Sequence, residues 1–130
     1  MDRIRLRLSP LIANLARSAP SSPISTPCQA RLLSRKPETT ALIHDRVTEI
    51  YQITEGSGTI VTGGSLENAT ATDLTRLNAG PSHTGTHKGG ESKHVGVKDV
   101  IIIPAGMPHR FSQLDGPAIV YLVYRFEPKP

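Results

Sequence analysis

Residues 44–59 read HDRVTEIYQITEGSGT. β-Branched and aromatic side chains fill Val47–Thr54, the run stops at Glu55 and Gly56, and a second extended run covers Ser57–Thr62. A strand, a tight glycine turn and a second strand form the pattern of a β-hairpin. We therefore predict a hairpin whose turn lies at Gly56.

Further short strands are expected along the chain. The strand pattern recurs in Glu91–Val97, Asp99–Ile103, His109–Phe111 and Ala118–Phe126, and a proline-glycine turn at 104–108 separates the second of these from the third. Residues 64–90 are polar and contain glycine, so we expect mostly loop there, with one helical turn around Ala71–Leu77. Many short strands with almost no helix predict an all-β sandwich or barrel.

The direction in which Glu49 points decides whether the barrel holds a site. Alternation along the strand puts Glu49 on the same face as Val47, Tyr51 and Ile53, and this mostly apolar face is the expected interior. A carboxylate in the interior is costly unless it is paired, hydrogen-bonded or bound to a metal. In the opposite register Glu49 would be solvated, and the strand alone leaves both registers open.

Two histidines favour the inward register. His44 precedes Glu49 by five residues, and His109 directly follows the turn at 104–108. Two imidazoles and one carboxylate suit Fe(II), Mn(II), Ni(II), Zn(II) or Cu(II), and they leave coordination positions open. Because a single histidine at a strand end is commonly just a surface residue, the prediction depends on the spacing of all three residues.

The segments at 44–56 and 104–109 resemble the two signature motifs of the cupin superfamily. The matching residues are a histidine, a glutamate and a glycine in the first motif and a proline, a glycine and a histidine in the second: His44, Glu49, Gly56, Pro104, Gly106 and His109. The resemblance covers residues 38–127 and implies a double-stranded β-helix, or jelly-roll barrel, in one domain at 38–130. It also implies that His44, Glu49 and His109 are ligands of a divalent metal ion.

The chain departs from the family pattern at the fourth ligand. Leu42 stands where the family has its first histidine, so the vacant position is left to water, His83 or His87. Lys36 and Lys98 stand where the family has the glycines that open its two motifs, and Gln113 stands where it has the asparagine that ends the second motif.

The resemblance implies two classes of function. In the first, the chain is a small metalloenzyme of dioxygenase, isomerase or lyase type that acts on a small organic molecule in the barrel. Tyr51, on the same face as Glu49, would then orient the substrate or donate a proton, or else simply pack in the core. In the second class, favoured by Leu42, the chain is a non-catalytic small-molecule-binding module with a weakened or absent metal site. A homodimer is also implied, and the hydrophobic strand Ala118–Phe126 is compatible with it.

Charge separates the N-terminal residues from the rest of the chain. Residues 1–37 carry seven basic residues and one acidic residue, whereas residues 38–130 carry eight basic and ten acidic residues, so the net charge of +4 comes from the first segment. The domain itself therefore has no basic surface that indicates nucleic-acid binding. No apolar run approaches the ~18 residues that cross a bilayer, so we expect no membrane insertion.

Residues 1–37 are predicted to be a poorly structured N-terminal extension outside the barrel. They are rich in arginine, serine and proline, and their single acidic residue is Asp2. This composition is typical of an organellar transit peptide and equally of a disordered extension, so the expected location is organellar in the first case and cytoplasmic in the second. Because Cys28 is the one cysteine of the chain, an intrachain disulfide is excluded.

Overall fold

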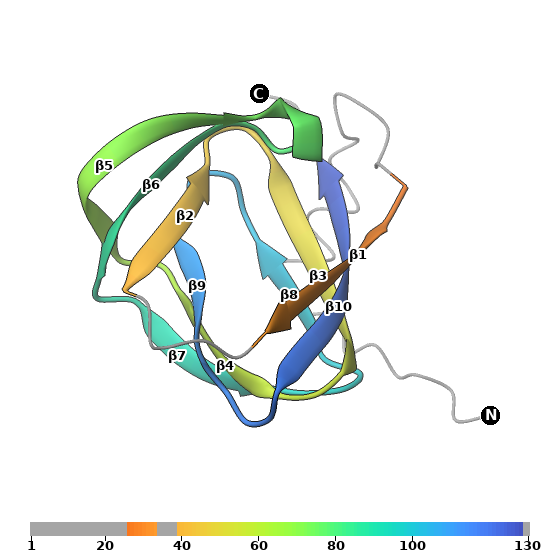
Figure 1. The fold of residues 1–130 in the computed structure, drawn as a ribbon. Helices are drawn as coiled ribbons and strands as arrows, with labels where there is room; N and C mark the ends of the chain where they lie inside the picture. Colours follow the sequence, from red (N-terminus) through yellow and green to blue (C-terminus); the bar gives the residue numbers. More distant parts are fainter. Residues whose placement is uncertain (1–25, 34–38, 129–130) are drawn as a thin grey trace.

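The fold consists of two antiparallel sheets that face each other, as a computed structural model of residues 26–33 and 39–128 shows (Figure 1). The four-stranded sheet has the order β1-β10-β3-β8, and the six-stranded sheet has the order β5-β6-β2-β9-β4-β7. The strands are β1 (Cys28–Leu33), β2 (Thr40–His44), β3 (Thr48–Glu55), β4 (Gly58–Thr62), β5 (Ser65–Leu74), β6 (Gly80–Lys88), β7 (Glu91–Val95), β8 (Val100–Ile103), β9 (His109–Leu114) and β10 (Ala118–Phe126). The predicted all-β fold is confirmed.

The core lies between the two sheets and is made by alternate residues of their strands. Its buried members come from β3, β4, β7, β8 and β10: Tyr51, Ile53, Ile60, Val95, Ile103, Ile119 and Val123. Tyr51 and Ile53 show that the predicted inward face of β3 is correct, and Glu49 on that face is 1% exposed. The register in which Glu49 would be solvated is therefore excluded.

The predicted hairpin around Gly56 is wrong, although both of its strands exist. β3 belongs to the four-stranded sheet and β4 to the six-stranded sheet, so the chain crosses between the sheets at Gly56. Gly56 has φ +78°, and a Cβ there would collide with the carbonyl oxygen of Ala118. The glycine turn was identified correctly, but short-range pattern carries no information on which strand lies beside which.

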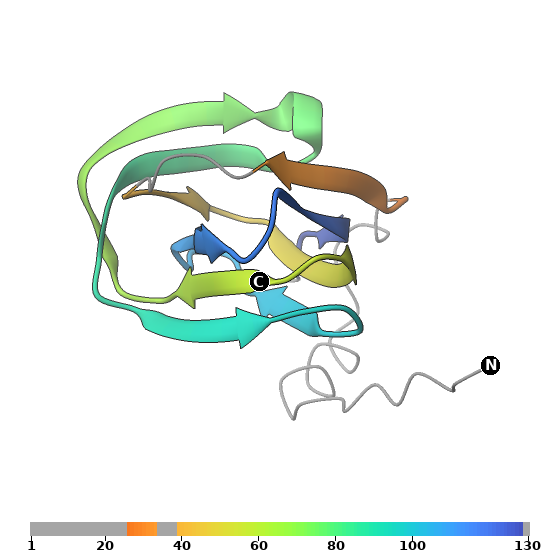
Figure 2. The same ribbon diagram turned by 60° about the horizontal axis from the view of Figure 1, so that its bottom comes forward.

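The prediction of mostly loop at 64–90 is also wrong. β5 and β6 form a long antiparallel pair there, and Figure 2 shows β5 at one edge of the six-stranded sheet and β7 at the other. Most side chains of β5 are exposed, so the strand lacks the apolar alternation by which strands are recognised. The helical turn expected around Ala71–Leu77 is confined to a short 3-10 helix, η1 (Thr75–Leu77). No helix among the described residues is long and apolar enough to cross a membrane.

The six residues of β1 also differ from expectation. They were predicted to lie in the extension, but they pair with β10 along the edge of the four-stranded sheet. Ala30 and Leu32 pack against the core, while Gln29 and Arg31 are exposed. The alternation of buried and exposed side chains in β1 is only six residues long and follows a proline-rich stretch. The strand was therefore not recognised from the sequence. The rest of the predicted extension, residues 1–25 and 34–37, lies outside the described residues.

Removing the apolar contact of β1 is expected to lower stability. Leu32 packs on the core opposite Ile119, so Leu32→Ser should lower the free energy of unfolding by about 1–2 kcal/mol. Its neighbour Leu33 is 53% exposed, so Leu33→Ser should change that free energy by less than about 0.5 kcal/mol. Urea unfolding of the two variants measures both values. Equal losses in the two variants would show that β1 does not contribute to the core.

Candidate metal centre

The candidate centre is assembled from both sheets. His44 ends β2 and His109 begins β9, and these strands are neighbours in the six-stranded sheet. Glu49 comes from β3 in the opposite sheet. The turn of the second motif is tied to the first motif by a hydrogen bond, in which the backbone N–H of Gly106 donates to the carbonyl of His44 over 2.8 Å. The two motifs therefore meet inside the barrel.

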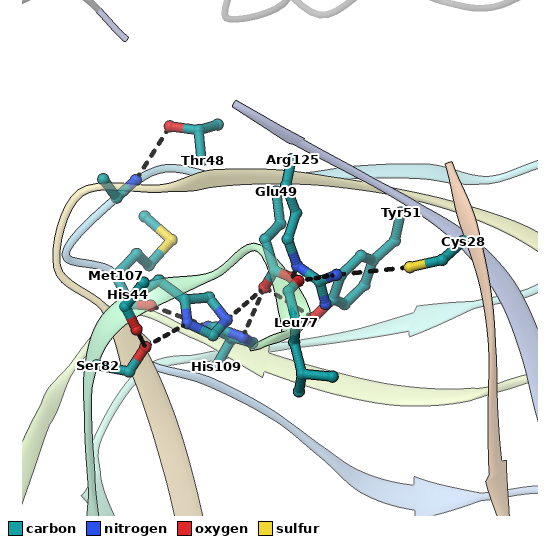
Figure 3. A network of polar contacts seen from close by, with 12 residues as sticks. Cys28, His44, Thr48, Glu49, Tyr51, Leu77, Ser82, Met107, His109 and Arg125 are labelled. Carbon is teal, nitrogen blue, oxygen red and sulfur yellow. Dashed lines mark hydrogen bonds and ion pairs between the residues drawn. The ribbon is translucent and has the colours of Figure 1, made fainter. Parts of the chain in front are cut away.

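Both imidazoles lie within hydrogen-bond distance of one carboxylate oxygen. Oε1 of Glu49 lies 2.8 Å from Nε2 of His44 and 3.2 Å from Nε2 of His109 (Figure 3). The hydroxyl of Tyr51 donates to the same oxygen over 3.1 Å. His44, Glu49 and His109 are all buried, and their candidate ligand atoms lie within 4.8 Å of one another. The structure thus contains a buried His/Glu/His group that could hold a metal ion.

The far nitrogen of each imidazole is bonded to protein. Nδ1 of His109 donates to the carbonyl of Met107 over 3.1 Å. Nδ1 of His44 lies 2.9 Å from the hydroxyl of Ser82, and that hydroxyl donates in turn to the carbonyl of Gly80, so the imidazole is the donor. Such bonds fix the ring orientation of metal-binding histidines and leave Nε2 as the ligand atom.

These observations agree with the donor set that a divalent ion requires. Nε2 of both imidazoles faces Oε1 of Glu49. A divalent ion between these atoms would bind both nitrogens free of protons, since metal ligands bind in their deprotonated forms. The two imidazole nitrogens and one carboxylate oxygen are ligands that first-row ions accept. The predicted residues therefore fit the predicted cofactor class.

The electrostatics of the site keep Glu49 ionised and Tyr51 neutral. Burial alone would raise the pKa of Glu49, but the hydrogen bonds from His109 and His44, together with their charges, outweigh burial and hold that pKa well below its usual value. Burial and the negative charge of Glu49 raise the pKa of Tyr51 well above 10. Tyr51 is therefore a hydrogen-bond donor in this site.

An aromatic cluster lines the side of the site where Tyr51 lies. The ring of Tyr51 lies 4.6 Å from that of Tyr121 and 6.3 Å from that of Phe111, measured between centroids. Burial, followed by the charge of Glu49, raises the pKa of Tyr121 to about 12. Tyr51 thus packs in the core and donates a hydrogen bond to Glu49, and its contact with a substrate stays a prediction.

Sequence analysis did not identify Arg125 and Ser82 as residues of the site. Nε of Arg125 donates to Oε2 of Glu49 over 2.8 Å, and its side chain is 15% exposed. One signal for Arg125 was present, because alternation in β10 places it on the same face as the core residue Val123. A charged side chain on an apolar interior face indicates a buried partner. Ser82 offered no comparable signal in a segment that was expected to be loop.

The two histidines considered as a fourth ligand lie outside the cluster. His83 is 39% exposed and pairs with Asp45 over 2.7 Å. His87 is buried, but its ring bonds to the carbonyl of Gly63 and to Arg110. Of the described residues, only His44, Glu49 and His109 form a group of metal-ligand type. Leu42, at the vacant family position, pairs directly with His109 across β2 and β9.

Comparison with known proteins gives structural matches only. No family model matches the chain, and no curated protein matches it. Among solved structures, an oxalate oxidase described for its mechanism is 22% identical with a TM-score of 0.39, and it matches 77% of this chain and 41% of its own. A recombinant oxalate oxidase in complex with glycolate is 20% identical, also with a TM-score of 0.39. The chain spans about two fifths of the length of these proteins.

Proposed function

We propose that this chain is a metal-binding protein of cupin type, in which His44, Glu49 and His109 hold one divalent ion, and that it is a small metalloenzyme. The observation that carries the proposal is the convergence of two imidazole Nε2 atoms on one buried carboxylate oxygen, with both Nδ1 atoms bonded to the protein. The metal can be Fe, Mn, Ni, Zn or Cu, since these ions accept this donor set.

The proposed substrate is a small organic molecule bound inside the barrel beside the ion. A divalent ion there would polarise an anionic or carbonyl-bearing substrate or bind dioxygen, as in dioxygenases, isomerases and lyases. Three protein ligands leave coordination positions open for such a molecule. The aromatic rings of Phe111, Tyr51 and Tyr121 lie together beside the site and give that side an apolar lining.

Tyr51 is proposed as a catalytic residue that donates a hydrogen bond to the substrate. Its hydroxyl is within hydrogen-bond distance of Glu49, and its raised pKa keeps the proton on the phenol oxygen. A phenol that keeps its proton can orient a substrate oxygen next to the metal, but it is a weak acid for transferring that proton.

The experiment that tests the proposed function has two steps. Metal analysis of protein purified without added metal should find close to one divalent ion per chain. Oxygen uptake and NMR are then used to screen small carboxylic and aromatic compounds for turnover, and Tyr51→Phe should lower kcat about tenfold at unchanged metal content, because one hydrogen bond to the substrate is lost. Turnover at the wild-type rate in Tyr51→Phe would remove Tyr51 from the mechanism.

The second candidate function is a non-catalytic module that binds a small molecule with little or no metal. Leu42, which lies beside His109 in place of a fourth imidazole, favours this alternative. Purified protein without metal that still binds a compound from the same screen, but does not convert it, would support the module.

The homodimer implied by the resemblance remains a prediction. β10 is hydrogen-bonded to β1 on one side and to β3 on the other, so its edges are not open to a second copy. A dimer that uses Ala118–Phe126 must therefore contact the outer face of the four-stranded sheet. Light scattering coupled to size-exclusion chromatography measures the mass directly.

A further inference from the structure

We propose that Arg125 is a built-in counter-ion of Glu49, which stabilises the barrel without a metal and weakens the binding of divalent ions. This inference rests on the proposed metal site. It assigns a role to a residue outside the ligand set, on the strand that closes the barrel. It concerns the affinity of the site for divalent ions rather than the reaction.

The first observation is that the Glu49 carboxylate is divided between two kinds of partner. Oε1 faces the imidazoles of His44 and His109, whereas Oε2 accepts the hydrogen bond from Nε of Arg125 (Figure 3). With Oε2 bound to the guanidinium, only Oε1 is directed at the proposed metal position. Arg125 is therefore a positioning residue that favours monodentate binding through Oε1.

The second observation is that Arg125 is held by contacts that do not involve Glu49. Its Nη1 donates to the carbonyl of Leu77 in η1 over 2.9 Å, and it also lies 3.5 Å from Sγ of Cys28 in β1. Both contacts are made by Nη1, whereas Glu49 is bonded to Nε, so they would persist if a metal drew Glu49 away. The positive charge would thus stay beside the site when an ion is bound.

The charges of the site then explain the expected effect. Glu49 and Arg125 form a buried ion pair, and their opposite charges cancel without a metal. A divalent ion adds two positive charges next to a fixed guanidinium in a buried region, where charges interact more strongly than in water. Removing Arg125 leaves the buried Oε2 of Glu49 without its guanidinium partner, which destabilises the metal-free chain and favours the metal-bound one.

The test compares Arg125→Met with the wild type by calorimetric titration with Mn²⁺ and Zn²⁺ and by urea unfolding. We expect Arg125→Met to be less stable than the wild type without metal, to bind each ion about tenfold or more tightly, and to regain stability when the ion is added. Arg125→Lys keeps the charge and should bind the ions with nearly wild-type affinity. A merely structural role for Arg125 would lower stability without tightening the binding of either ion.

Arg110→Met is the matched control, because Arg110 is another partly buried arginine but bonds to His87 rather than to a carboxylate of the site. It should leave both metal affinities unchanged.

If Arg125→Met does not fold, Arg125→Gln replaces it, because the amide can still donate to Glu49 without carrying a charge. Unchanged or weaker metal binding in the uncharged variant would overturn the counter-ion role, whereas no metal binding in any of the proteins would overturn the proposed function itself.

Discussion

Replacing His109 with alanine is expected to abolish metal retention. The change removes one of three protein ligands and leaves His44 and Glu49, a two-ligand set that binds divalent ions weakly. His109 is 6% exposed and bonds to Glu49 and to the carbonyl of Met107, so the variant should also lose about 1–3 kcal/mol of stability while keeping its fold. Metal content after purification and the circular dichroism spectrum give the two readouts.

His87→Ala is the matched control for this variant. His87 is also a buried histidine on the six-stranded sheet, and it bonds to Gly63 and Arg110 outside the metal group. We expect it to lose stability but to retain the metal of the wild type. If His109→Ala kept wild-type metal content, or if His87→Ala lost it, the ligand set would be wrong.

Replacing Leu42 with histidine is expected to tighten metal binding about tenfold or more, because late first-row ions gain affinity with each added imidazole. Leu42 lies two residues before His44 on β2, which places both side chains on one face of the strand. It also pairs directly with His109 on β9, and side chains of directly paired residues lie side by side. A histidine at this position is therefore directed at the same point as the other two.

Ile43→His provides the control for Leu42→His. Ile43 is the next residue of β2, points to the opposite face and pairs with His83. It should leave the metal dissociation constant unchanged, whereas Leu42→His should lower it. The dissociation constant is the decisive quantity, because an added ligand can also occupy a position that the substrate needs. An unchanged constant in Leu42→His would mean that the vacant position is not open to a side chain from Leu42.

The parts of the fold that follow from local pattern were predictable from the sequence. Strand alternation put Glu49 and Tyr51 in the interior, and the closing strand Ala118–Phe126 was found with its bounds. The partner of each strand was not predictable in the same way. β3 and β4 follow each other across Gly56 as a hairpin would, but they join different sheets, because contacts between distant strands decide the pairing. β5 was missed because its exposed polar side chains carry no apolar period.

In the candidate site, too, the residues within local motifs were predictable and those brought in from distant strands were not. His44, Glu49 and His109 lie in two short motifs whose spacing is visible in the sequence. Ser82 and Arg125 reach the site from 38 and 76 residues away from their partners His44 and Glu49. No local pattern links residues at such separations. The residues that orient His44 and balance the charge of Glu49 therefore became visible only in the folded chain.

Anomalous X-ray scattering from crystals of the chain loaded with Zn²⁺ locates the bound ion and identifies its ligands. We predict one ordered zinc ion per chain, bound by Nε2 of His44, Oε1 of Glu49 and Nε2 of His109 at about 2.0–2.2 Å. An anomalous peak elsewhere on the chain, or no peak while both imidazoles still bond directly to Glu49, would contradict it.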